Sequence, residues 1–117
     1  MSLARGRKAC RRARQALRAA GKQLLESESP LFHEEVARAL VEYVADRFNR
    51  AAAGLTYESV DQLLGSRGLE ETLRRRFRTC LESCDFARFV PSAARSESRE
   101  ETLREAETIV DELERAL

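Results

Sequence analysis

Apolar side chains in the middle of the chain recur every three or four residues, and this spacing constrains the fold more than any other feature. Between residues 30 and 52 they occupy the positions Phe32, Val36, Leu40, Tyr43, Val44 and Phe48. Residues at that spacing line one face of an α-helix, whereas a half-buried strand alternates apolar and polar residues. Because no segment of the chain alternates in this way, the sequence predicts an all-α fold.

Caps and helix breakers divide the chain into five expected helices. Pro30 suits only the first turn of a helix, Ser29 before it is a good N-cap, and Gly54 is expected to end that helix. The 117 residues fit one domain. We expect a basic helix within residues 1–29 and a compact helical bundle over 30–117, with helices at about 4–27, 30–52, 57–64, 69–84 and 98–117.

An irregular segment is expected before the last helix, over residues 85–96. Its aromatic residues Phe86 and Phe89 are predicted to fill the core as the chain crosses it. Ser98 and Glu101 have the spacing of a capping box, in which each side chain satisfies the other residue's free backbone N–H, so the last helix is predicted to begin there.

Charge is distributed unevenly along a chain whose net charge is only +1. Residues 1–22 contain eight Lys or Arg and no acid, whereas residues 95–117 contain four bases and eight acids. Such blocks predict an electrostatic role or a partner for the charged end, or else an ordinary solvated helix face. The near-zero total argues against a strongly basic nucleic-acid-binding protein.

Few residues of the sequence are candidates for catalysis or metal binding. The three cysteines, Cys10, Cys80 and Cys84, are an odd number and fit a reducing compartment better than a disulfide framework. A zinc site would need all three to converge with the only histidine, His33, so core packing is the preferred interpretation. His33 is expected in an exposed or capping position. We expect no catalytic, cofactor or metal site, and therefore no enzyme.

An arginine-rich helix over residues 69–84 offers one binding hypothesis. A short helix, a glycine-containing turn over residues 65–68 and this helix together resemble a helix-turn-helix outline. In that arrangement Arg74, Arg75 and Arg78 would contact nucleic-acid phosphates or a partner. The alternative is a solvated basic face, which the charge-neutral segment 55–94 favours.

The basic first helix offers another hypothesis. A block of bases without acids is typical of the cytoplasmic segment that follows a transmembrane helix, and it would favour anionic lipid. Met1–Leu3 reads as an added start, so the chain is expected to be the soluble fragment of a larger membrane protein. The alternative is a basic helix packed on its own domain. The predicted membrane-surface contacts are Arg5, Arg7, Lys8, Arg11, Arg12 and Arg14.

Six stretches of the chain carry a family resemblance. They are FHEEVARAL at residues 32–40, YVADRF at 43–48, AGLTYE at 53–58, LLGSRG at 63–68, CDFARFVP at 84–91 and the helix over 106–117. They resemble the cytoplasmic C-terminal region of the BatD, or oxygen-tolerance, family of bacterial membrane proteins. Members of that family have extracytoplasmic immunoglobulin-like modules, a transmembrane helix and then this helical tail.

The resemblance implies a non-enzymatic protein-interaction tail at the cytoplasmic face of the bacterial inner membrane. Its implied partner is a MoxR-type AAA+ ATPase or a von Willebrand A-domain protein, in a system for envelope stress or oxygen tolerance. The family attaches no catalytic residue to this tail. The resemblance also implies that residues 84–91 fix the domain, with Phe86 and Phe89 buried and Arg88 paired to an acid.

Overall fold

The computed structural model describes the backbone of residues 2–26, 31–86 and 92–117, and side chains within 8–22, 32–86 and 99–117. Across these ranges it contains helices and no strand, which confirms the all-α prediction. The elements are α1 (Ser2–Glu26), α2 (Leu31–Phe48), the 3₁₀ helix η1 (Ala52–Gly54), α3 (Tyr57–Ser66), α4 (Glu71–Phe86) and α5 (Ser92–Ala116).

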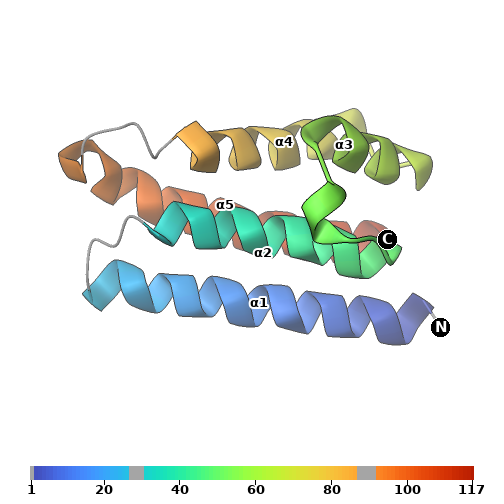
Figure 1. Ribbon diagram of the computed structural model, residues 1–117, viewed down its shortest axis with the longest axis horizontal. Coiled ribbons are helices and arrows are strands. Elements are labelled where there is room, and N and C mark those ends of the chain that lie inside the picture. The colour runs from blue at the N-terminus through green and yellow to red at the C-terminus, as the bar shows by residue number, and fades with distance from the viewer. Residues whose placement is uncertain (1, 27–30, 87–91) are drawn as a thin grey trace.

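The four long helices run back and forth along one axis and form a single bundle (Figure 1). Helices α2 and α5 contact each other, and α1 and α4 pack on opposite sides of that pair. The short elements η1 and α3 connect the end of α2 to the start of α4. The bundle measures 43 × 24 × 23 Å, with a radius of gyration of 13.8 Å.

Helix α1 forms one wall of the bundle, which settles a question that the sequence left open. Its buried residues Ala9, Ala13, Ala20 and Leu17 are mostly small and belong to the same core cluster as large side chains of α2 such as Phe32. Small side chains allow two helix axes to approach closely. Since α1 also packs against α5, it belongs to the same core as the rest of the chain.

Helix α2 ends at Phe48, six residues before the glycine expected to end it. Asn49 adopts the left-handed conformation with φ 55°, and the N–H of Arg50 donates to the Ala45 carbonyl at 2.8 Å. This bond is the capping interaction of a helix that ends in a left-handed residue, and asparagine adopts that conformation more readily than most residues. The prediction for Gly54 was therefore wrong.

Helix α3 begins as predicted, because the Thr56 hydroxyl caps it by accepting from the Ser59 N–H at 3.1 Å. Ser59 returns a bond to the Thr56 N–H at 2.9 Å, which completes a capping box. The helix continues through Ser66, so the predicted turn over residues 65–68 begins too early. Gly68, at φ 75°, makes the turn toward α4.

The ends of α4 and α5 correct the prediction of an irregular segment over residues 85–96. Helix α4 continues to Phe86, and α5 already begins at Ser92. Ser98 and Glu101 therefore lie inside α5 and do not mark its start, because the preceding alanine, serine and arginine residues also adopt the helix. Phe86 is 71% exposed, so the prediction that it fills the core was wrong.

The remaining predictions for this segment concern Arg88 and Phe89. Both lie outside the described residues.

Candidate functional site

His33, the only histidine, is buried rather than exposed. Only 2% of it is accessible, and its ring lies edge-on to Phe32 with 5.1 Å between the ring centroids. The first turn of α2 therefore buries His33 beside Phe32, which corrects the prediction that this histidine is exposed. Among the described side chains, no group of three or more His, Cys, Asp or Glu could hold a metal ion.

The three cysteines are buried free thiols, as the core-packing interpretation predicted. A hydrogen bond to Cys80 and burial raise the pKa of the Cys84 thiol, and burial raises the pKa of Cys10. A thiol must lose its proton to act as a nucleophile, so these environments disfavour the reactive thiolate of both residues.

The arginines of α4 that the sequence assigned to a partner already face carboxylates of this chain. Arg74 pairs with Asp61 at 3.2 Å, which links α4 to α3. Arg75 pairs with Glu71 at 3.2 Å, and Arg78 pairs with Glu82 at 3.6 Å. Both acids lie one turn away on α4 itself. A nucleic-acid phosphate would have to compete with each of these acids.

Arg76, which the sequence did not single out, lies between α4 and α5. It contacts Glu105 at 2.9 Å and Glu112 at 2.5 Å. These ion pairs offset the positive charge of α4 on the side that faces α5. They also link the arginine-rich helix to the rest of the bundle.

The predicted membrane contacts on α1 separate into distinct groups. Arg12 pairs with Asp46 of α2 at 3.4 Å, and Arg14 pairs with Asp111 of α5 at 2.5 Å. The side chains of Arg5 and Arg7 lie outside the described residues. Lys8 and Arg11 are exposed and belong to a larger group of cations along the helix.

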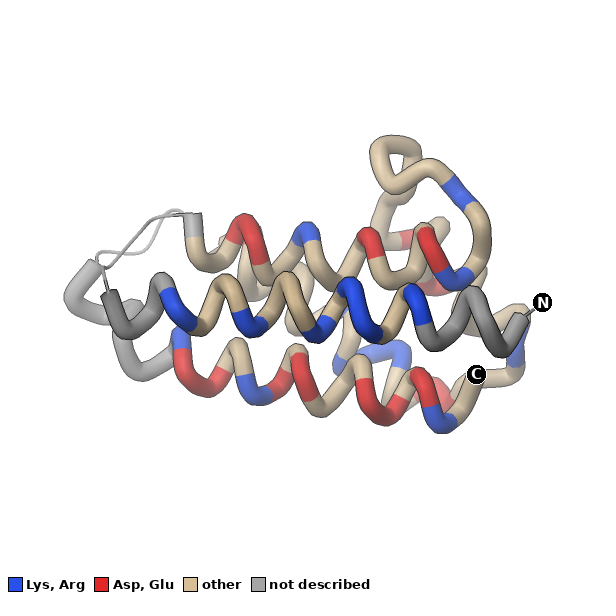
Figure 2. The backbone as a smooth tube through the Cα atoms, turned by 90° about the horizontal axis from the view of Figure 1, so that it is seen from below, with Lys and Arg blue, Asp and Glu red and all other residues tan. Residues whose placement is uncertain are grey.

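This group, which we call the α1 basic stripe, comprises Lys8, Arg11, Arg18 and Lys22. All four are exposed, and at 3.6 residues per turn they fall within about 80° of arc. The buried residues of α1 lie on the opposite side of the helix, so the stripe faces solvent. Figure 2 shows the basic positions along α1. None of the four forms an ion pair with a described residue.

Acidic positions of the neighbouring helices border the stripe on both sides (Figure 2). A polar hollow of about 260 Å³ lies where α1 meets the end of α2, and Lys8, Arg12, Asp46 and Arg50 line it. With three cations against one carboxylate, this hollow extends the positive surface beyond the stripe at that end of the bundle.

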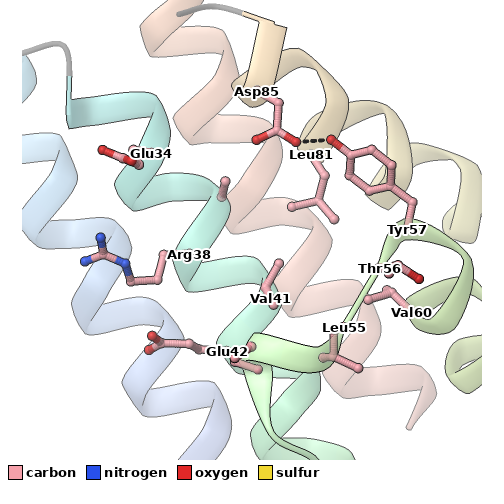
Figure 3. A pocket seen from close by; sticks show the side chains of 13 residues that line it. Glu34, Arg38, Val41, Glu42, Leu55, Thr56, Tyr57, Val60, Leu81 and Asp85 are labelled. Atoms are coloured by element: carbon pink, nitrogen blue, oxygen red, sulfur yellow. Dashed lines mark hydrogen bonds between the residues drawn. The ribbon is translucent and has the colours of Figure 1, made fainter.

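A second surface is a groove between α2, the η1–α3 segment and α4, with a volume of about 600 Å³ (Figure 3). Val60 and Leu81 are buried at its base, and the half-buried Val41 and Leu55 form its sides. The groove is therefore apolar at its centre.

Charged residues border this groove. Glu34, Arg38 and Glu42 follow one another along α2, and Asp85 lies across from them on α4 (Figure 3). The Tyr57 hydroxyl donates a hydrogen bond to the Asp85 carboxylate, which joins α3 to α4 at one end of the groove.

Comparisons with other proteins add no family assignment to these surfaces. No family model matches the chain, and neither a curated protein nor a solved structure matches it. Of the helices that the structure describes, none combines the length and apolar character needed to cross a bilayer.

Proposed function

We propose that this chain is a non-enzymatic interaction module that rests on an anionic membrane surface through α1. The observation that carries the proposal is the α1 basic stripe, a row of exposed cations directly opposite the core. A helix that buries one face in its own domain and presents free cations on the other can contact lipid head groups without unfolding.

The size of the effect fits a weak and reversible contact. A base near an anionic surface contributes about 1 kcal/mol, so the four stripe residues together contribute about 4 kcal/mol. Arg12 and Arg14 contribute less, because Asp46 and Asp111 already offset their charge. Such an affinity suits a domain tethered beside the membrane, where the effective concentration of lipid is high.

The resemblance to the BatD family gives this proposal its biological setting. We place the module at the cytoplasmic face of the bacterial inner membrane, as the tail of a larger membrane protein. Its protein partner in that setting is a MoxR-type AAA+ ATPase or a von Willebrand A-domain protein, within an envelope-stress or oxygen-tolerance system.

Vesicle sedimentation tests the membrane contact. The protein should bind vesicles with about one third anionic lipid more tightly than neutral vesicles, and salt should weaken this binding. Replacing Arg11 and Arg18 by glutamine should weaken it by about tenfold or more, since each base contributes about 1 kcal/mol. Replacing Arg104 and Arg115, exposed cations of α5, is the matched control and should change binding less than twofold.

If the Arg11/Arg18 and Arg104/Arg115 double variants lost vesicle binding equally, that result would contradict a role for the α1 basic stripe. Duplex DNA binding that is lost in Arg75→Gln would instead favour the helix-turn-helix alternative. That alternative has less support, because Arg74, Arg75 and Arg78 all pair with acids of the chain.

A further inference from the structure

We propose that the polar hollow where α1 meets the end of α2 binds a dianionic phosphate group, the group that a phosphate monoester carries. The monoester belongs either to a lipid or to a soluble molecule. This inference rests on the proposed membrane contact only in the lipid case, because a soluble monoester would enter the same hollow without a bilayer. It adds a site of defined chemistry to a surface that otherwise attracts any anion.

Small residues of both helices leave room for this hollow. Ala9 of α1 and Ala45 of α2 line it and are buried, whereas the other lining residues carry polar side chains. Its volume of about 260 Å³ corresponds to about eight water molecules, at about 30 Å³ each. A phosphate group therefore has room to enter together with part of its hydration shell.

The charges that line the hollow favour an anion even after the contacts within the chain are counted. Arg12 Nη1 lies 3.4 Å from both carboxylate oxygens of Asp46, so these two charges offset each other. Lys8 and Arg50 also line the hollow, are exposed, and form no ion pair with a described residue. Two uncompensated positive charges remain, one from each helix. A dianion neutralises both of them, whereas a monoanion such as a phosphodiester neutralises one.

The hydrogen-bond donors around the hollow suit the oxygens of a phosphate group. The planar guanidinium of Arg50 can donate two parallel hydrogen bonds to phosphate, and Lys8 supplies an ammonium. Asn49 lines the hollow as well, and its side-chain amide forms no hydrogen bond with a described residue. Because Asn49 is left-handed at φ 55°, α2 ends at this point, and the residues at its end are available to a ligand.

The hollow lies at one edge of the α1 basic stripe, so a lipid phosphate can reach it while the stripe faces the membrane. Lys8 belongs to both, and Arg12 lies about 40° further round α1 than Lys8. Lys22, at the other end of the stripe, is about 21 Å from Lys8 along the helix. A phosphate site therefore distinguishes one end of the stripe from the other, which a purely electrostatic contact does not.

Soluble probes test the site without a membrane. Amide NMR spectra would be recorded with glycerol phosphate, a monoester, and with dimethyl phosphate, a monoanionic diester, at the same ionic strength. The shifted resonances should come from residues 8–12 and 45–50. We expect glycerol phosphate to bind at least about threefold more tightly than dimethyl phosphate, because it forms one more exposed ion pair.

Variants of the lining residues test the charge argument. Lys8→Gln and Arg50→Gln should each weaken glycerol phosphate binding by about threefold to fivefold. Lys22→Gln, which removes an exposed cation of α1 outside the hollow, should change it less than twofold. Asp46→Asn should instead strengthen binding by about threefold or more, because it removes the carboxylate and frees Arg12. A gain in affinity cannot result from unfolding.

Vesicles distinguish the two sources of the phosphate. Phosphatidic acid, whose head group is a phosphate monoester, would be compared with phosphatidylglycerol in vesicles adjusted to the same zeta potential. A preference for phosphatidic acid that Arg50→Gln loses would assign the site to a lipid. Glycerol phosphate binding without that preference would assign it to a soluble monoester.

The same measurements separate the phosphate site from the membrane contact. Replacing Arg11 and Arg18 should weaken binding to both kinds of vesicle and leave glycerol phosphate binding unchanged, because neither residue lines the hollow. Two results would overturn the phosphate site. One is no binding of glycerol phosphate together with no preference for phosphatidic acid. The other is equal binding of glycerol phosphate and dimethyl phosphate with no gain in Asp46→Asn.

Discussion

Tyr43, Arg47 and Glu114 form a polar contact inside the bundle where the sequence pattern predicts only apolar packing. The Tyr43 hydroxyl donates to Glu114 Oε1 at 2.7 Å, and Arg47 Nε donates to the same oxygen at 3.2 Å. Tyr43 was correctly placed on the core face of its helix. The burial of Arg47 could not be predicted in this way, because a place near the end of a helix favours a cation but does not indicate burial, and its side chain is only 7% exposed.

The titration of Tyr43 leads to a prediction for alkaline pH. Burial and the hydrogen bond to Glu114 raise the pKa of Tyr43 above its ordinary value of 10.0. The stabilisation that this shift represents is complete below pH 10 and is lost as pH rises, because the unfolded state releases the proton first. Above about pH 10, the free energy of unfolding should fall by about 1.4 kcal/mol per pH unit through this group.

Urea denaturation of the wild type and of Tyr43→Phe would measure this effect. Near pH 8 the variant should be less stable by about 1 kcal/mol, because it lacks one hydrogen bond. By about pH 11 the difference in the free energy of unfolding between the two proteins should disappear or change sign, because phenylalanine does not titrate. The buried thiols are present in both proteins, so their titration cancels in the comparison. A stability difference that stays constant up to that pH would show that Tyr43 does not titrate in this way.

At the scale of the helices, the apolar spacing predicted which elements form, but not where each one ends. The end of α2 depends on Asn49, a residue that is less often left-handed than glycine, so Gly54 was the stronger signal in the sequence. The start of α5 was missed for a related reason. Ser98 and Glu101 have capping-box spacing, but a capping box forms only where the preceding residues leave the helix.

The conformation of Asn49 gives a prediction for this scale. Asn49→Val should lower the free energy of unfolding by about 1 to 2 kcal/mol, because a Cβ-branched side chain is strained at positive φ. Asn49→Gly should stay within about 0.5 kcal/mol of the wild type, because glycine accepts this conformation but gains freedom in the unfolded chain. Ala51→Val is the control, since Ala51 is exposed and extended at φ −78°. Equal melting temperatures for the valine variants would contradict this account of the helix end.

At the scale of the molecule, the charge blocks of the sequence become contacts between helices as well as free surface. Arg12, Arg14 and Arg76 each pair with an acid of another helix. The sequence indicated that the first helix is basic, but the number of its free cations depends on which of them lie beside α2 and α5. Arg18 and Lys22, which were not among the predicted contacts, are exposed and belong to the free cations of this helix.

The groove could not be predicted from the sequence at all. Its lining comes from α2, the η1–α3 segment and α4, and no one of these carries a recognisable motif for it. Val60 and Leu81 have the spacing of ordinary core residues, and only the way that α3 packs on α4 leaves a hollow beside them. A site assembled from separate elements becomes visible once their packing is known.

The pairing of the basic first helix with the acidic last one gives a prediction for the whole bundle. Arg14 Nη2 lies 2.5 Å from Asp111 Oδ1 across the contact between α1 and α5, and both side chains are about half exposed. Reversing either charge alone, as Arg14→Asp or Asp111→Arg, places like charges together and should lower the free energy of unfolding by about 1 kcal/mol. The double variant restores opposite charges, so it should recover most of that loss.

Urea denaturation of the wild type, both single variants and the double variant forms a complete cycle that isolates the coupling between the two residues. We expect a coupling of about 0.5 to 1 kcal/mol at low salt and a smaller value near 1 M salt, where the screening length is about 3 Å. Arg11→Asp is the matched control on α1, because Arg11 forms no ion pair with a described residue and should show no coupling to Asp111→Arg. Strictly additive losses for Arg14 and Asp111 would mean that α1 and α5 are held together by their apolar contacts alone.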